Sequence, residues 1–349
     1  MSSTEPPVLA RRAGRLGHLV LNRPRAINAL THEMVLLLTA QLEEWADDDA
    51  VETIVLSGAG SRGLCAGGDM VALWRDAREG GSAAAAFWAD EYRLNALIAE
   101  YPKTFVAAMD GIVLGGGIGL SAHAGTRVVT ERSSIGMPET GIGFLPDVGG
   151  TWLLSRTPGQ LGTHLALTAG SVGAADAIAL GLADHMVPSD RLGDLIERLA
   201  VEDPADAVAA VEFGAPEPEL PLAQDWIDSC YAGDDLGVIV ERLATSDEPA
   251  AREAADTIGR RSPTALAVTL RALRESADFS DLRESLDLEY RLACRLFATH
   301  DAAEGIRAQL VDKDRDPRWD PATIIGVDPA LVESCFASLG DDELGLASS

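Results

Sequence analysis

Residues 104–123, "TFVAAMDGIVLGGGIGLSAH", decide the fold class of this chain. The run "TFVAAM" predicts a short buried strand, and the apolar residues after the glycines predict a helix. Three consecutive glycines between them let the backbone approach a neighbouring segment closely. A strand that passes through a glycine loop into a helix is typical of α/β proteins.

The same alternation recurs on both sides of this segment. A helix is predicted over residues 31–49, with Thr31 as its N-cap. Strands separated by helices predict an α/β core with parallel pairing. Besides the strand above, strands are predicted at residues 17–23, 52–58 and 126–131.

The pattern becomes almost entirely helical after residue 203. One of these helices is expected to begin at Ser262, an N-cap residue, with Pro263 in its first turn. We therefore predict two regions: an α/β core over residues 1–203, and a helical region with a tail over residues 204–349.

Composition and charge exclude several classes of protein. Apolar residues make up 47% of the chain and charged residues 24%, the balance of a globular protein in water. The formal charge of −27 disfavours nucleic acid and anionic membranes as partners, because their phosphates would be repelled. No apolar run reaches the ~18 residues that span a bilayer, and the N-terminus lacks a secretory signal pattern.

The cysteines and histidines do not show the spacing of a metal site. The four cysteines are scattered without a CxxC pair, and the six histidines form no HxxxH or HExxH pattern. We expect no metal site. Free thiols are typical of a reducing compartment, so a cytoplasmic location is expected.

A dinucleotide-binding fingerprint, Gly58-x-Gly60-x-x-Gly63, follows the predicted strand at 52–58. In a Rossmann fold a helix opens at these glycines. Here "LCAGGD" intervenes, and the helical pattern begins only near Asp69. We therefore consider an NAD-binding domain and disfavour it.

Two strand–glycine–helix junctions favour a different site. Each presents a backbone N–H near the start of a helix, and two such donors can converge on one oxygen. Gly68 and Gly116 are the natural donors. Such an oxyanion hole suits a carbonyl that gains negative charge, although tight helix packing also explains the glycines.

A third glycine-rich segment, "MPETGIGFLPDVGG" at residues 137–150, carries two acids, Glu139 and Asp147. Each has a simpler interpretation. Glu139 follows Pro138 and suits the first turn of a helix, and Asp147 suits an N-cap before "VGGTWLLSR". No GxSxG nucleophile elbow competes with these acids.

Together these segments resemble the crotonase (enoyl-CoA hydratase/isomerase) superfamily. The resemblance extends from about residue 17 to about residue 340. The matching pieces, in family order, are "NRPRAINAL", "CAGGDM", "GGGIGL", "MPETGIGFLPDVGG" and "ALTAGSVGAADAIALGLADHMV". The resemblance implies a spiral of repeated ββα units, an acyl-CoA substrate, and a thioester oxygen held by the N–H groups of Gly68 and Gly116.

The acids indicate which branch of the superfamily this chain resembles. Hydratases of the superfamily use two glutamates, and the position of one of them is Gly119 here. The other glutamate matches Glu139. The motif "PET-x-IG-x-x-PDVGG", with Asp147 in place of a glycine, and the tail "DKDRDPRWDP" resemble the 3-hydroxyisobutyryl-CoA hydrolase branch.

This resemblance implies an acyl-CoA thioesterase, most naturally 3-hydroxyisobutyryl-CoA hydrolase of valine breakdown. Glu139 would attack the thioester directly or act as a general base on water. Asp147 would orient water or bond the 3-hydroxyl of the substrate. Two nearby acids also separate their pKa values, so that one stays protonated.

Further residues are expected at the substrate. Glu91, in "DEYRLN", matches a position that the branch uses near the substrate, although an exposed helical residue is an equal alternative. Asp69 directly follows the oxyanion glycine. By resemblance, CoA lies against the loop and segment that contain Arg25, Ala26, Asn28 and Ala66.

No cofactor is implied, because CoA is part of the substrate. A homo-oligomer, trimer or dimer, is expected, and the extended tail offers the alternative of capping its own active site. Two other functions stay open. One is a hydratase or isomerase that retains only Glu139, and the other is a non-catalytic acyl-CoA-binding protein.

Overall fold

The computed structural model describes residues 5–347, which form two compact units. The first unit contains the residues up to 69 together with 93–136 and 172–219, and the second contains 70–92, 137–171 and the residues from 220 on. This grouping differs from the change of pattern at residue 203, because two earlier segments join the C-terminal helices. The predicted division into domains stays a prediction.

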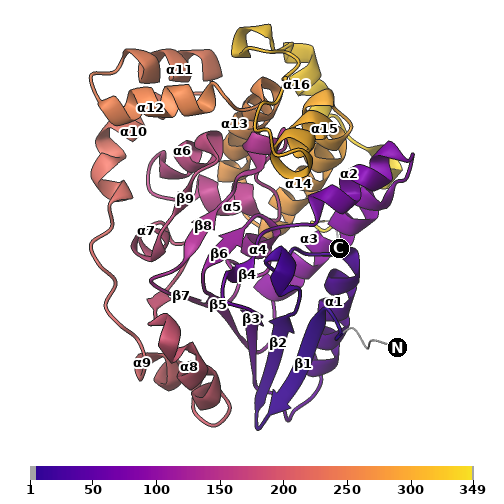
Figure 1. Cartoon of the computed structure of the whole chain (residues 1–349), viewed down its shortest axis with the longest axis vertical. Coiled ribbons are helices and arrows are strands. Elements are labelled where there is room, and N and C mark those ends of the chain that lie inside the picture. Colours follow the sequence, from indigo (N-terminus) through magenta and orange to yellow (C-terminus); the bar gives the residue numbers. More distant parts are fainter. Residues whose placement is uncertain (1–4, 348–349) are drawn as a thin grey trace. The chain divides into compact units, whose positions relative to one another are not determined.

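Within the described residues, the first unit contains a six-stranded sheet in the order β1-β2-β3-β5-β7-β10. Figure 1 shows β1, β2, β3, β5 and β7 of this sheet side by side. β1 (Val8–Ala13) and β2 (Leu16–Leu21) form an antiparallel hairpin, and the other strands pair in parallel. Gly14 makes the hairpin turn at φ +59°, which glycine adopts without strain. The remaining strands are β3 (Thr53–Gly58), β5 (Thr104–Met109), β7 (Thr126–Val129) and β10 (His185–Met186).

These strands confirm the expected α/β alternation. The apolar runs at 53–58 and 104–109 are buried almost throughout, as parallel strands require. The strands predicted at 17–23 and 126–131 each end two residues early, at Leu21 and Val129. Leu195 and Leu199 of α8 (Leu192–Leu199) pack against one face of the sheet.

A second, smaller sheet has the order β4-β6-β8-β9. β4, β6 and β8 pair in parallel, so the carboxyl ends of β4 and β6 lie side by side at one edge. This edge carries both glycine junctions. The strands are β4 (Gly63–Cys65), β6 (Ile112–Leu114), β8 (Ser134–Gly136) and β9 (Ser171–Val172).

Helix α1 (His32–Ala46) begins as predicted, because the Thr31 hydroxyl accepts from the Met34 N–H at 3.3 Å. Helix α3 (Ala83–Ala99) starts in the second unit and continues into the first after Tyr92. The other helices of the first unit are α4 (Gly116–Gly119), α7 (Ala174–Ala179) and α9 (Pro204–Ala209).

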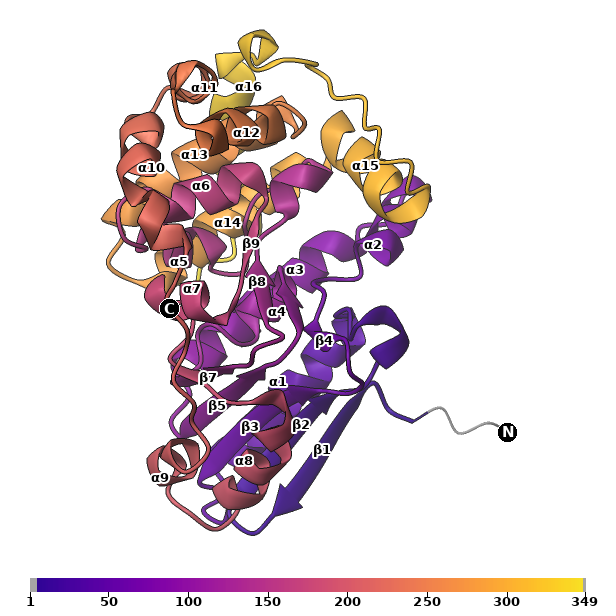
Figure 2. The same ribbon diagram turned by 60° about the vertical axis from the view of Figure 1, so that its left-hand side comes forward.

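The second unit is helical. α13 (Pro263–Asp278) packs against α5 (Gly150–Ser155) and α6 (Leu161–Thr168), and α14 (Leu282–Phe297) also contacts α5 (Figure 2). Ser262 caps α13 as predicted, accepting from the Ala265 N–H at 3.1 Å. The remaining helices are α2 (Met70–Arg78), α10 (Gln224–Tyr231), α11 (Leu236–Thr245), α12 (Pro249–Ile258), α15 (His300–Ile306) and α16 (Pro329–Phe336).

Candidate active site

The segment that carries both predicted catalytic acids is buried in the second unit. Glu139 opens the 3₁₀ helix η2 (Glu139–Ile142), and Asp147 lies in the loop before α5. Between them, Gly143 adopts φ +74°, and a Cβ there would lie 2.4 Å from the backbone of Asp301. The glycine therefore allows the loop to lie directly against α15.

Asp147 is not the helix cap that the sequence allowed as an alternative. The N-cap of α5 is Gly149, and the Asp147 side chain instead accepts a hydrogen bond from the Tyr92 hydroxyl at 2.7 Å. The residue is only 6% exposed. Burial raises its pKa, whereas the hydrogen bond from Tyr92 lowers it by stabilising the charged form.

Glu139 does occupy the first turn of a helix, but it is not a solvated surface acid. Its Oε2 atom is buried, and no described residue gives it a hydrogen-bond partner. Burial raises the pKa of Glu139 well above its ordinary value, and the negative charge of Asp147 raises it further. An acid with an unpaired buried oxygen is costly to keep, as expected of a functional group.

Glu91 is 2% exposed, so the alternative of an exposed helical residue is wrong. It lies on α3 directly before Tyr92, and its Oε1 atom has no partner among the described residues. Burial raises the pKa of Glu91 well above its ordinary value, and the charge of Asp147 adds to the shift. Glu91, Glu139 and Asp147 thus interact electrostatically as one cluster.

Two members of this cluster were missed from the sequence. Tyr92 is the hydrogen-bond donor to Asp147, and Glu289 of α14 is a fourth buried acid. The signal for Glu289 was its place on the apolar stripe of its helix, at helical spacing from the buried Leu286 and Leu296. A charged residue on such a stripe indicates a specific partner.

The two glycine junctions predicted to form an oxyanion hole lie together in the first unit. Gly67 is close to the second junction, since a Cβ on it would lie 3.8 Å from the Gly116 nitrogen. The hydrogen bonds of the described residues give the N–H groups of Gly68 and Gly116 no protein acceptor. Both donors are thus available to a ligand oxygen.

The residues expected around CoA gather in the same unit. The Ala66 N–H donates to Ile27 at 3.0 Å, which joins the two predicted segments, and Arg25 and Ala26 are exposed. Asp69 forms an ion pair with Arg23 at 3.0 Å. The Asp69 side chain therefore ties the segment after Gly68 to the loop that begins at Arg23.

The side chain of Asn28 has a structural role, and its contact with CoA stays a prediction. It is fully buried, and its amide nitrogen contacts the carbonyl oxygens of Ala59, Gly63 and Leu64 at 3.0–3.1 Å. The side chain is therefore occupied in fastening loops together. The Asn28 N–H also donates to the Arg23 carbonyl at 3.0 Å, so its backbone carbonyl is the group left for a substrate contact.

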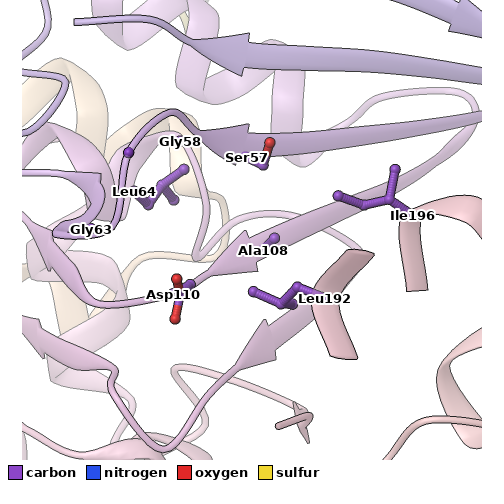
Figure 3. Close-up of a pocket in the computed structure, with 9 residues that line it drawn as sticks. Ser57, Gly58, Gly63, Leu64, Ala108, Asp110, Leu192 and Ile196 are labelled. Carbon is purple, nitrogen blue, oxygen red and sulfur yellow. The ribbon is translucent and has the colours of Figure 1, made fainter. Parts of the chain in front are cut away.

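The dinucleotide fingerprint does not form a nucleotide site. Gly63 belongs to strand β4 rather than to a helix, and a Cβ on it would lie 2.4 Å from Ile112. The three glycines line a cavity of about 150 Å³, which Leu192 and Ile196 of α8 also line. Figure 3 labels Gly58, Gly63 and these two apolar residues around it. Asp110, at its wall, is already paired with Arg132.

No group of three or more histidine, cysteine, aspartate and glutamate residues within the described part of the chain is arranged to hold a metal ion. Over the same residues, no helix is long and apolar enough to cross a membrane. The expected lack of a metal site remains a prediction.

Comparison with known proteins identifies the family. A model of the family described as "Enoyl-CoA hydratase/isomerase" matches residues 16–336. The chain therefore belongs to the enoyl-CoA hydratase/isomerase family, and its α/β fold is the crotonase fold predicted from the sequence.

Within the family, the chain is similar to proteins named "3-hydroxyisobutyryl-CoA hydrolase, mitochondrial". It is 38% identical to the protein of Danio rerio, covering 97% of this chain and 91% of that protein. It is 39% identical to the protein of Rattus norvegicus, covering 97% and 90%.

Two solved structures are similar over almost the whole chain. One, described as a carnitinyl-CoA dehydratase from Mycobacterium thermoresistibile, is 48% identical with a TM-score of 0.95, covering 99% of this chain and 100% of that chain. The other, described as an enoyl-CoA hydratase from Rhodobacter sphaeroides 2.4.1, is 44% identical with a TM-score of 0.92, covering 97% and 99%.

Proposed function

We propose that this protein hydrolyses short 3-hydroxyacyl-CoA thioesters, with 3-hydroxyisobutyryl-CoA as the substrate. The observation that carries the proposal is the buried pair of acids, Glu139 and Asp147, together with Gly119 at the position where the resemblance implies the second glutamate of a hydratase. The names of the relatives from Danio rerio and Rattus norvegicus support the same reaction.

In the proposed reaction, an oxygen atom adds to the thioester carbonyl carbon, and the carbon–sulfur bond then breaks. The CoA thiolate leaves with a proton, and the acid product keeps the oxygen of water. Glu139 acts in one of two ways. Its own oxygen attacks the carbonyl carbon to give an anhydride, which water opens at the acyl carbon to release the acid and restore Glu139, or it is a general base that deprotonates the attacking water. Its unpaired buried oxygen supports both routes.

Asp147 and Glu91 act on the rest of the substrate in this proposal. Asp147 has one oxygen bonded to Tyr92, which leaves the other for water or the 3-hydroxyl group. Glu91 carries an unpaired oxygen of its own and is proposed to face the acyl group. The charge of Asp147 favours the protonated forms of Glu91 and Glu139, so the cluster both donates and accepts protons.

The N–H groups of Gly68 and Gly116 are proposed to stabilise the oxyanion that forms during the attack. Their closeness in the first unit and their lack of a protein acceptor support this role. The loop residues Arg25, Ala26, Ala66 and Asp69, and the backbone of Asn28, are proposed to bind CoA. No cofactor takes part apart from the CoA of the substrate.

Glu139 is expected to be essential for thiol release. Glu139→Gln removes the group that delivers oxygen, so thiol release from 3-hydroxyisobutyryl-CoA should slow by at least about 100-fold, the scale of losing one catalytic group. A thiol-reactive dye measures the rate, and the thermal midpoint shows that the variant is folded. Near-normal turnover of this variant would contradict the role of Glu139.

A hydratase or dehydratase is the second candidate function. The names of the two similar solved structures favour it, at 44–48% identity. It predicts that crotonyl-CoA loses its absorbance without thiol release. A panel of short acyl-CoAs, with and without the 3-hydroxyl, followed by both readouts, separates the two reactions and also the non-catalytic alternative.

We also propose a place in valine breakdown, a cytoplasmic location and a homo-oligomer, trimer or dimer. The cytoplasmic location is supported only by the free cysteines, whereas the names of the curated relatives say mitochondrial. Cell fractionation tests the location, and analytical ultracentrifugation tests the oligomeric state.

A further inference from the structure

Glu289 is a buried acid that the reaction proposed above does not use. It lies on α14, is fully buried, and accepts three hydrogen bonds from the start of α5. The Gly149 N–H donates at 2.6 Å, the Thr151 N–H at 2.8 Å, and the Thr151 hydroxyl at 2.5 Å. All three donors come from the short segment that directly follows Asp147.

This segment has a backbone that needs support. Val148, a β-branched residue, adopts φ +55°, and Gly149 adopts φ +80°. A β-branched residue in the left-handed region is strained and persists only where its surroundings enforce it. The carboxylate of Glu289 provides such enforcement, because it holds the N–H groups on both sides of Gly150 at once.

Asp147 is thereby held from two directions. Tyr92 bonds its carboxylate at 2.7 Å, and Glu289 bonds the backbone two and four residues later. The Thr151 hydroxyl continues the network to Ser276 of α13 at 2.7 Å. The segment carrying Asp147 is thus fastened to α3, α13 and α14.

We propose that Glu289 is a positioning residue that holds the strained loop after Asp147 and so fixes the Asp147 carboxylate for thioester hydrolysis. The inference rests on the proposed function for its catalytic consequence. Other titratable groups act on this region: Glu91, Tyr92, Glu139 and Asp147. Glu289 contacts none of the reacting atoms and acts through Asp147.

The test compares Glu289→Gln with Asp287→Asn. Asp287 is a matched control, because it lies on the same helix and also accepts from two backbone N–H groups, those of Leu346 and Ala347, at 2.8 and 2.9 Å. An amide presents a donor where each acid presents an acceptor, so both substitutions disturb hydrogen bonds from two backbone N–H groups. Only Glu289 binds the N–H groups of the loop that follows Asp147.

Two readouts decide the proposal. Glu289→Gln should lower kcat of thiol release by about 10- to 100-fold, the scale of misplacing a catalytic group, with KM little changed, whereas Asp287→Asn should leave kcat unchanged. Hydrogen exchange should accelerate at Gly149 and Thr151 in the first variant, and at Leu346 and Ala347 in the second. Equal losses of kcat, or unchanged exchange at Gly149 and Thr151, would overturn the proposal.

A second pair of variants covers the case in which Glu289→Gln does not fold. Thr151→Val removes one donor and should lower kcat and speed exchange at Gly149, and Thr151→Ser should restore both. A failure of Thr151→Ser to restore them would also overturn the proposal. Hydrogen exchange needs no turnover, so it still decides the positioning role if no acyl-CoA proves to be a substrate.

Discussion

The Asp147 carboxylate sets the protonation of its neighbours. It has a hydrogen bond from Tyr92, whereas Glu91 and Glu139 each carry an unpaired buried oxygen. A hydrogen bond to the charged form stabilises that form, so Asp147 loses its proton first. Its negative charge then raises the pKa of Glu91 and Glu139 beyond the effect of burial alone.

This order predicts the pH dependence of thiol release. Glu139 must lose its proton to attack or to act as a base, and its pKa is raised, so kcat/KM should increase as pH rises above neutrality. Asp147→Asn removes the nearby charge and should move this increase to lower pH, even as it slows the reaction. A profile that does not move in this variant would contradict the coupling between Asp147 and Glu139.

The Tyr92 hydroxyl is expected to support thiol release through its bond to Asp147. Tyr92→Phe removes the hydroxyl bonded to Asp147, and hydrogen bonds to charged groups contribute about 1.5–3 kcal/mol. We expect kcat for thiol release to fall by about 10- to 100-fold, a factor of 10 for each 1.4 kcal/mol. Tyr101→Phe is the control, because its hydroxyl donates at the same 2.7 Å to the backbone of Leu42 in the other unit. Similar losses in both variants would argue against a specific role for Tyr92.

Two short helices, η2 and α5, position the acids: Glu139 lies in η2, and Asp147 lies directly before α5. η2 and α5 contain only 4 and 6 residues, too short to be stable by themselves. Packing against α13, α14 and α15 therefore supplies their stability. The precision of the acid cluster depends on these later helices.

The caps of two helices give a prediction at this scale. Thr31→Ala removes only an N-cap bond of α1 and should cost about 1 kcal/mol of stability. Ser262→Ala should cost more, because Ser262 also donates to the buried Oδ2 atom of Asp301 at 2.5 Å, and its loss leaves that acid with one hydrogen-bond donor fewer, the Asp320 N–H at 2.8 Å remaining. Thermal melts of both variants measure the difference, and an equal decrease would contradict the added role of Ser262.

For the whole molecule, the buried acids make stability depend on pH. A carboxyl whose native pKa is raised binds more protons folded than unfolded, so stability falls as pH rises from the ordinary value towards the native one. Burial raises the pKa of Glu289 from 4.5 to about 8, and those of Glu91 and Glu139 are also raised. The buried acids therefore lower the stability of the folded protein at the neutral to basic pH at which Glu139 must lose its proton to act.

Glu91→Gln tests this cost. The neutral amide cannot ionise, and each unit by which a native pKa is raised corresponds to about 1.4 kcal/mol. We expect the thermal midpoint of the variant, relative to the wild type, to be higher at pH 8 than at pH 5. The exposed Glu43→Gln is the control and should show no such difference. The opposite trend for Glu91→Gln would show that Glu91 is ionised in the folded protein.

The sequence alone determined the α/β class, the positions of the main strands and helices, and two helix caps. These features depend on local periodicity and capping chemistry, which neighbouring residues carry. The same holds for the choice of Glu139 and Asp147 as candidate acids. Their sequence motif is local, and both proved to be buried.

Only the tertiary structure decided how these acids are held. Tyr92 lies 55 residues before Asp147 in the sequence, and Glu289 lies 142 residues after it. Tertiary packing alone brings them to the Asp147 loop, so no local sequence pattern links them. Likewise, the amide of Asn28 proved to fasten loops, and the fingerprint glycine Gly63 proved to allow close strand packing. Burial and hydrogen-bond partners arise from contacts between distant segments, and these contacts set the pKa values on which the chemistry depends.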